Sequence, residues 1–105
     1  MWRQGASWVR SRPQALPYVP SSNEHVRVVL AERFVRSYID APPEVQKAFG
    51  KQLAHLLRNL RRPSLDAKKY DEKRDLWQAR VDRAWRFYFQ IEGDAYHLID
   101  ITPHP

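Results

Sequence analysis

The chain has 105 residues and no cysteine, and its 18 Lys and Arg outnumber its 12 Asp and Glu, giving a formal net charge of +6. This length predicts one domain with one modest core. The missing cysteines exclude disulfides, thiolate metal sites and cysteine nucleophiles. No apolar run approaches the roughly 20 residues of a membrane span, and the N-terminal residues lack the apolar region of a signal peptide. We therefore expect a cytoplasmic protein with no membrane partner.

The positive charge is concentrated in one part of the sequence. Residues 58–86 contain ten Lys and Arg against five Asp and Glu, whereas residues 87–105 contain three acids and no Lys or Arg. A basic segment of this kind attracts phosphate groups, so nucleic acid is one expected partner. A solvated surface and an acidic partner protein are the other two interpretations of the same charge.

The first predicted elements are an N-terminal arm, a strand and a short helix. Residues 1–23 are predicted to form the arm, because prolines interrupt them and no helical or strand period is visible. The domain is expected over residues 24–105. A strand is predicted from His25 to Leu30, where β-branched residues are frequent. A helix follows from about Ala31 to Ile39, because its apolar residues share one face.

A second helix is predicted after Pro43, since proline is tolerated in the first turn of a helix. It carries apolar residues at steps of three and four, namely Val45, Phe49, Leu53, Leu56 and Leu60. Arg61-Arg62-Pro63 is expected to end it. His55 lies beside the apolar stripe and is interpreted as a boundary residue. The two helices are predicted to form a hairpin that covers an apolar surface.

Three strands are predicted after the helices, over Leu76–Val81, Trp85–Ile91 and Ala95–Ile101. In the first two, polar side chains alternate with apolar ones and share one face, namely Gln78, Arg80, Arg86, Tyr88 and Gln90. Together the elements predict an α+β fold. An N-terminal strand and a helical hairpin pack on one face of a mainly antiparallel sheet, which a C-terminal three-strand meander completes.

Arg80 and Arg86 are predicted to lie directly opposite each other. A three-residue loop of Asp82, Arg83 and Ala84 produces this pairing and keeps each set of side chains on one face. Opposed residues have Cβ atoms roughly 5 Å apart, and like charges there are destabilising. A nearby acid, side chains splayed into water, or a bound anion would each relieve the repulsion. The anion is the functional interpretation, because arginine binds phosphate through two parallel hydrogen bonds.

Short motifs follow one another in a recognisable order between residues 63 and 104. They are Pro63-Ser64-Leu65 with Lys68-Lys69, then Trp77-Gln78-Ala79-Arg80-Val81, Trp85-Arg86, Glu92-Gly93-Asp94 and Pro103-His104. In this order and spacing they resemble the RelE/ParE superfamily of toxins from bacterial type II toxin–antitoxin systems, and in particular its RelE/HigB-like branch. The resemblance covers the chain from about His25 to His104.

The resemblance implies a toxin that cuts mRNA in the ribosomal A site with no metal or other cofactor. Such toxins activate the ribose 2′-hydroxyl to attack the adjacent phosphate. Arg80 and Arg86 match family arginines and would stabilise charge in the transition state. His104 matches the C-terminal histidine of the HigB-like branch and would act as general acid or base. The implied partners are a cognate antitoxin, mRNA and the ribosome.

Four further residues, Lys68, Lys69, Gln78 and Tyr88, are expected to contact the substrate. Lys68 and Lys69 match basic residues of the family's loop before the first meander strand. They would hold the RNA backbone, or one would serve as a base if its pKa were lowered. Tyr88 or Trp77 would stack on a base, or else pack against neighbours. The alternatives on this fold are a ParE-like inhibitor of DNA gyrase and an inactive relative that binds RNA or an antitoxin.

Overall fold

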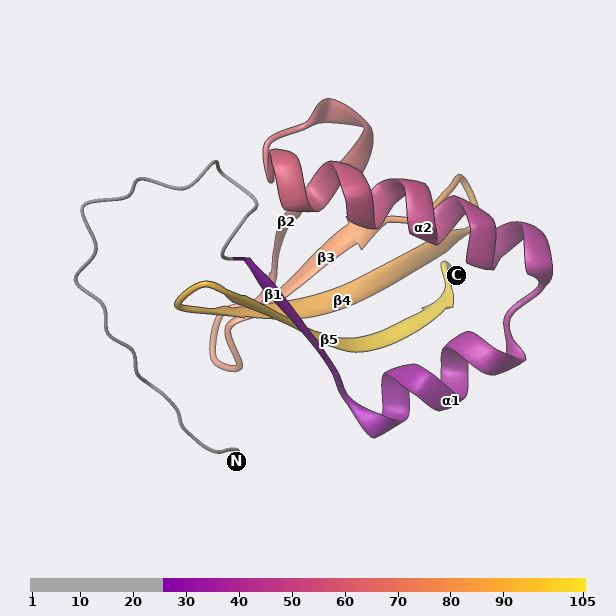
Figure 1. Cartoon of the computed structure of the whole chain (residues 1–105), viewed down its shortest axis with the longest axis horizontal. Coiled ribbons are helices and arrows are strands. Elements are labelled where there is room, and N and C mark those ends of the chain that lie inside the picture. Colours follow the sequence, from indigo (N-terminus) through magenta and orange to yellow (C-terminus); the bar gives the residue numbers. More distant parts are fainter. Residues whose placement is uncertain (1–25) are drawn as a thin grey trace.

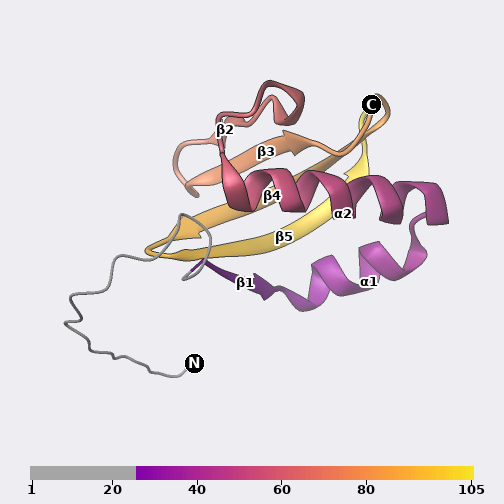
Figure 2. The ribbon, with the colours of Figure 1, turned by 45° about the horizontal axis from the view of Figure 1, so that its top comes forward.

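The computed structural model describes residues 26–105, so the arm expected over residues 1–23 lies outside the described residues. The elements are β1 (Arg27–Leu30), α1 (Glu32–Asp40), α2 (Pro43–Arg58), the short 3₁₀ helix η3 (Pro63–Leu65), β2 (Lys68–Asp71), β3 (Leu76–Arg80), β4 (Trp85–Glu92) and β5 (Ala95–Pro103). Five strands form one sheet in the order β1-β5-β4-β3-β2. Helix α2 crosses over the strands and α1 lies along β5 (Figures 1 and 2). No helix within residues 26–105 is long and apolar enough to cross a membrane.

The predicted α+β fold is confirmed, and the sheet has one strand more than expected. β1 pairs in parallel with β5, whereas the other ladders are antiparallel. The additional strand is β2, which contains Lys68 and Lys69, two residues that the sequence placed in a loop. β2 is only four residues long and its register shifts after Lys69. It therefore lacks the run of alternation by which a strand is recognised in a sequence.

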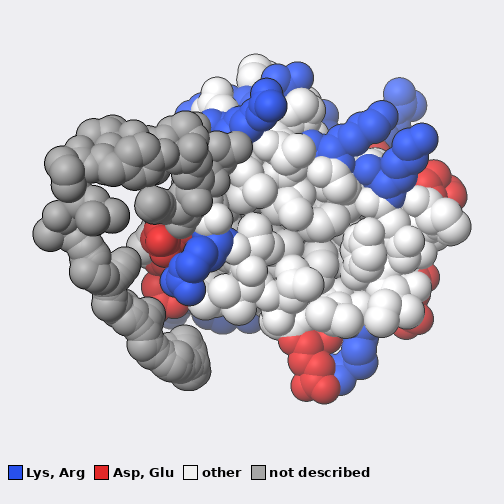
Figure 3. All heavy atoms as spheres, in the orientation of Figure 1, with Lys and Arg blue, Asp and Glu red and all other residues white. Residues whose placement is uncertain are grey.

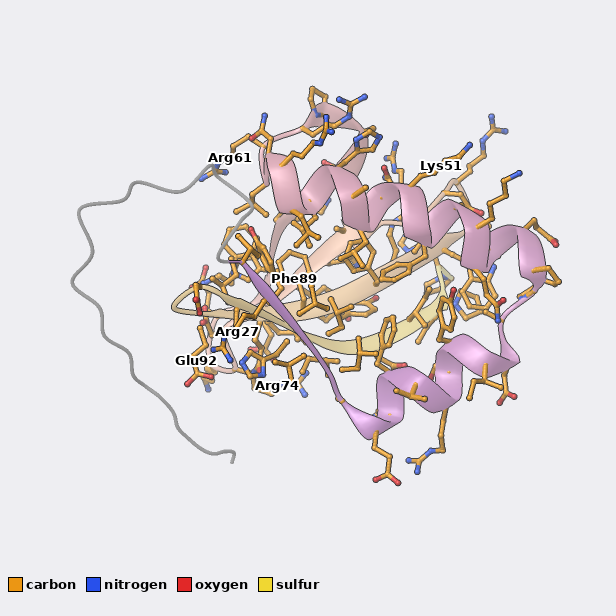
Figure 4. The ribbon with its side chains drawn as sticks, in the orientation of Figure 1. Arg27, Lys51, Arg61, Arg74, Phe89 and Glu92 are labelled. Carbon is orange, nitrogen blue, oxygen red and sulfur yellow. The ribbon has the colours of Figure 1, made fainter. Side chains whose placement is uncertain are left out.

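The core lies between the helices and the sheet. Phe87 and Phe89 of β4 are fully buried, and Figure 4 shows Phe89 beneath α2 while Lys51 and Arg61 point outward. The ring of Phe49 in α2 meets Phe87 edge-on, with centroids 5.1 Å apart. The apolar stripe predicted for the second helix is therefore the face that the helix buries.

The second helix ends earlier than the apolar stripe predicted. It stops at Arg58, because Asn59 has extended backbone angles and its N–H still bonds to the carbonyl of His55. Leu60 packs against the core from the following turn instead. His55 is half-buried, in agreement with its interpretation as a boundary residue.

A bulge in β5 lets two apolar residues that are three positions apart point into the core, which regular alternation would not allow. Leu98 and Ile101 are both buried, although side chains three positions apart lie on opposite faces of a regular strand. Their partners in β4 are Phe89 and Phe87, which are two positions apart, so Ile99 is the additional residue. The bulge thus lets both apolar side chains reach the core.

Asp71 holds the turn between β2 and β3. Its Oδ2 accepts a hydrogen bond from Arg74 Nε at 2.8 Å, and its Oδ1 accepts from the backbone N–H groups of Lys73 and Arg74 at 3.0 and 3.3 Å. The hydrogen bond from the Arg74 side chain, helped by those from the backbone, lowers the pKa of Asp71 below its ordinary value of 3.8.

Asp71→Asn is therefore expected to reduce stability at neutral pH and to matter less in acid. A carboxyl whose pKa is lowered by folding stabilises the fold above its unfolded pKa, and this contribution is lost as pH falls through the folded pKa. The melting temperatures of wild type and Asp71→Asn should therefore approach each other as the pH is lowered from about 7 to about 2. Circular dichroism measures both, with Glu72→Gln as a control in the same turn. A difference in melting temperature between the two proteins that stays constant with pH would contradict this explanation.

Figure 3 views the helix-bearing side of the molecule. Lys and Arg gather along the outer edge formed by α2, whereas the region between α2 and α1 carries few charges. The predicted polar side chains are on the opposite face of the sheet, where neither helix packs.

Candidate functional site

The helix-free face of the sheet carries the polar side chains that the sequence predicted for it. In the β3–β4 ladder Arg80 opposes Arg86 and Gln78 opposes Tyr88, and in the β2–β3 ladder Lys68 opposes Gln78. Opposed residues share a face of a sheet, so these five residues, from three adjacent strands, lie on one face. The predicted pairing of Arg80 with Arg86 is confirmed.

The two opposed arginines are held by different acceptors. Arg86 Nη1 donates to the carbonyl oxygens of Asp82 at 2.8 Å and Trp85 at 2.9 Å, in the turn between β3 and β4. Arg80 Nη2 lies 3.7 Å from Asp66 Oδ2. A nearby acid for one arginine and turn carbonyls for the other thus reduce the repulsion. Each guanidinium has several N–H donors, so both retain donors that can bind a phosphate.

The turn between β3 and β4 also fixes the backbone of His104. Asp82 Oδ1 accepts hydrogen bonds from the N–H groups of Ala84 at 2.8 Å and Trp85 at 2.9 Å, which closes the turn. The N–H of His104 donates to the Ala84 carbonyl at 2.7 Å. The turn that holds the Arg86 guanidinium therefore also anchors the backbone of His104, whose side chain is exposed.

Lys68 and Lys69 lie on opposite faces of the sheet. Lys68 is on the arginine face, with Nζ 3.8 Å from Asp66 Oδ2. Lys69 opposes Trp77 on the other face, and its Nζ lies 2.7 Å from Asp75 Oδ1 and 5.4 Å from the centre of the Trp77 ring. The hydrogen bond to Asp75 raises the pKa of Lys69, whereas a role as base would require a lowered pKa. The structure groups Lys68, but not Lys69, with the arginines.

Tyr70 lies beside Tyr88, and sequence analysis gave it no role. The two rings meet edge to face with centroids 5.1 Å apart, and Gln78 Nε2 donates to the Tyr88 hydroxyl at 3.1 Å. No strand was predicted over Lys68–Asp71, so alternation was not applied to Tyr70. Trp77, the other aromatic considered for stacking, packs against Phe89 on the core side at 6.1 Å.

Gln52 of α2 is a second residue that sequence analysis missed. Its side chain is buried, and its Nε2 donates to the carbonyl oxygens of Arg80 at 2.8 Å and Ser64 at 3.0 Å. These bonds join α2 to the end of β3 and to the loop that carries Asp66. Gln52 is three positions after Phe49 on the helix, so its spacing alone marked it as facing the core.

Gln52→Leu is expected to lower the free energy of unfolding by about 1–3 kcal/mol, because it removes the donor to the partly buried carbonyl oxygens of Arg80 and Ser64. Leucine fills similar space, so the loss reports the hydrogen bonds rather than a cavity. Chemical denaturation measures the change. Gln46→Leu is the matched control, because the Gln46 amide bonds the Tyr38 carbonyl from a more exposed position of the same helix. An equal loss in both variants would show that Gln52 has no special role.

Known proteins resemble this chain in structure and not in sequence. No protein family matches the sequence, and no curated protein is significantly similar to it. The structure is similar to a chain of the archaeal RelE–RelB complex from Pyrococcus horikoshii, with a TM-score of 0.63 and 18% identity over 75% of this chain and 94% of that one. It is also similar to the YoeB/ParE toxin from Agrobacterium tumefaciens, with a TM-score of 0.63 and 12% identity over 76% of this chain and all (100%) of that one.

A third similar structure is a chain of the intact RelBE toxin–antitoxin complex from E. coli, with a TM-score of 0.60 and 13% identity over 76% of this chain and 98% of that one. These similarities define an α+β fold shared with toxins of toxin–antitoxin systems. The chain has the RelE/ParE toxin fold, which is the fold that its sequence motifs led us to expect.

Proposed function

We propose that this protein is the toxin of a type II toxin–antitoxin system and a metal-independent endoribonuclease that cuts ribosome-bound mRNA. The observation that carries the proposal is the pairing of Arg80 with Arg86 on the helix-free face. Lys68 is on the same face, and His104 is anchored to the turn that binds Arg86. Two guanidinium groups, an ammonium and an imidazole supply charge stabilisation and proton transfer, the two requirements of ribose-assisted cleavage.

Each residue has a defined part in the proposed reaction. The ribose 2′-oxygen forms a bond to phosphorus, and the bond from phosphorus to the 5′-oxygen of the next nucleotide breaks. Arg80 and Arg86 stabilise the negative charge that develops on the phosphate oxygens. His104 transfers a proton to or from the reacting oxygens, because an imidazole nitrogen can donate or accept a proton. Lys68 binds a neighbouring phosphate. The products carry a 2′,3′-cyclic phosphate and a 5′-hydroxyl.

Asp66 lies near Lys68 and Arg80, two of the cations proposed to bind the RNA backbone. Its Oδ2 is within 3.8 Å of Lys68 Nζ and 3.7 Å of Arg80 Nη2, and about half of its side chain is exposed. Exposed ion pairs contribute only about 0–1 kcal/mol. A substrate phosphate can therefore replace the Asp66 carboxylate at small cost, and Asp66 keeps the two cations in place until it does.

A cognate antitoxin is the proposed protein partner, because two of the similar structures are toxins in complex with an antitoxin. The net charge of +6 favours acidic residues in the antitoxin segment that blocks or distorts the basic face. Its association rate with this protein should fall as salt concentration rises, which stopped-flow fluorescence can measure. A rate that is the same at low and high salt would count against an electrostatic contact.

Cleavage of ribosome-bound mRNA tests the proposed activity. The protein is treated with EDTA and returned to buffer containing only the magnesium that ribosomes require. We expect cleavage to persist and the new ends to carry 2′,3′-cyclic phosphates. Products with 5′-phosphate ends would contradict the mechanism. In cells, intact mRNA together with accumulated gyrase–DNA cleavage complexes would assign the protein to the ParE-like alternative.

A further inference from the structure

Tyr70 is the only aromatic side chain within residues 26–105 that is largely exposed, at 57% of its surface. It lies on the helix-free face, away from the core, and its aromatic neighbour is Tyr88. A large exposed ring contributes little to stability in this position. Its presence beside a row of basic residues therefore calls for a ligand with an aromatic surface.

The neighbours of Tyr70 hold the aromatic pair in a fixed geometry. Tyr88 lies between Phe87 and Phe89, which are fully buried on the other face of the sheet and fix the backbone of β4. Gln78 from β3 donates to the Tyr88 hydroxyl at 3.1 Å. The Tyr70 ring then meets Tyr88 edge to face at 5.1 Å. Tyr88 thus braces Tyr70, and a flat ligand can stack on the exposed ring without first ordering it.

The positive charges of Arg80 and Arg86 lie within the length of one nucleotide from the Tyr70–Tyr88 pair. The row formed by Gln78 and Tyr88 is adjacent to the row formed by Arg80 and Arg86 on the same face. Residues two apart in a strand are roughly 7 Å apart along the sheet. A base on the tyrosine pair would therefore have a phosphate within reach of the arginines.

We propose that Tyr70 and Tyr88 form a stacking site for an unpaired base of single-stranded RNA, next to the phosphate held by Arg80 and Arg86. The inference rests on the proposed function and extends it by assigning a base-binding site to the substrate. The site accepts any base, because every base has a π-face and stacking does not read hydrogen bonds. It excludes duplex RNA, whose bases are already stacked.

Binding of a short single-stranded 2′-O-methyl oligoribonucleotide tests the site, because the methyl group blocks the nucleophile and prevents cleavage. Fluorescence anisotropy at low salt gives the affinity of the full chain. We expect Tyr70→Ala to weaken binding roughly 5- to 150-fold, the factor that corresponds to loss of one base–aromatic stack. Tyr70→Phe should bind like wild type, since it keeps the ring. Ile39→Ala, at an exposed apolar residue of α1, is the matched control.

A second oligonucleotide with one abasic position separates stacking from other effects. Scanning the abasic position should find one site that weakens wild-type binding about as much as Tyr70→Ala does. Tyr70→Ala and the abasic position together should weaken binding no more than either change alone, since each removes the same contact. Additive losses, an equal loss in Tyr70→Phe, or wild-type binding by Tyr70→Ala would each overturn the stacking site.

The outcome separates this inference from the proposed function. Wild type that cuts mRNA on the ribosome, while Tyr70→Ala binds RNA normally, would remove the stacking site and leave the nuclease intact. Wild type that does not bind the oligonucleotide would also overturn the site, whatever happens on the ribosome. Wild type that leaves ribosome-bound mRNA intact would instead refute the proposed nuclease function.

Discussion

Replacing Arg80 with alanine is expected to slow mRNA cleavage by a factor of about 10²–10³ and to leave the free energy of unfolding almost unchanged. The loss is large because the guanidinium would stabilise charge that exists only in the transition state. Stability should change little, because the Arg80 side chain is 45% exposed and its ion pair with Asp66, at 3.7 Å between Nη2 and Oδ2, is exposed to solvent. Cleavage of ribosome-bound mRNA and chemical denaturation measure the two quantities.

Arg86 provides the informative comparison. Arg86→Ala should abolish toxicity. Unlike Arg80→Ala, it also removes the donor to the Asp82 and Trp85 carbonyls. We therefore expect a lower melting temperature for Arg86→Ala than for Arg80→Ala. His104→Ala should weaken cleavage by a smaller factor, because it removes only the proton transfer. This order of effects separates charge stabilisation from proton transfer.

Two further variants control for loss of charge. Arg83→Ala removes an exposed arginine from the same turn and should change cleavage about twofold at most. Arg80→Lys keeps the charge but cannot bind two phosphate oxygens at once, so it should recover only part of the activity. Full activity in both Arg80→Ala and Arg86→Ala would show that the arginine pair is not the catalytic centre.

Phe87→Ala is expected to lower the free energy of unfolding by about 3–5 kcal/mol, the largest effect on stability that we expect from one substitution. The Phe87 ring is fully buried, 5.1 Å from the ring of Phe49 and 5.6 Å from that of Phe89. Its removal leaves a cavity where helix and sheet meet. Domains are stable by about 5–15 kcal/mol in total, so part of the population should unfold at physiological temperature.

The matched control for Phe87→Ala is Ile39→Ala, because Ile39 is 67% exposed on α1. Its change should lie within about 0.5 kcal/mol of wild type. Denaturant unfolding followed by tryptophan fluorescence measures both variants. Equal losses at the two positions would mean that the cavity is filled by rearrangement or that Ile39 contacts more than the structure shows.

The strand pairing at the candidate site could be predicted from the sequence because it follows from two local properties. A strand alternates its side chains with a period of two, and the length of the hairpin loop sets which residues oppose each other. The polar residues of Leu76–Arg80 and Trp85–Glu92, with the loop between them, were sufficient to pair Arg80 with Arg86. The second helix could be predicted for a similar reason, since its apolar stripe continues along Pro43–Arg58.

The features that the sequence could not predict depend on a short strand or on distant contacts. β2 is only four residues long and was not predicted as a strand, so the placement of Lys68 and Lys69 on opposite faces was not visible. Tyr70 lies in the same strand, and its contact with Tyr88 comes from another strand. Gln52 bonds to Arg80, which is far away in the sequence. Only the folded chain brings these partners together.

The parallel pairing of β1 with β5 has a consequence for synthesis of the protein. Residues 27–30 leave the ribosome well before their partners, residues 95–98. Contacts between such distant segments form slowly, because a long loop must close before they contribute any stability. The nascent chain therefore cannot complete its sheet until residues 95–98 have emerged. A partner that is translated at the same time would thus meet this chain before its sheet is complete.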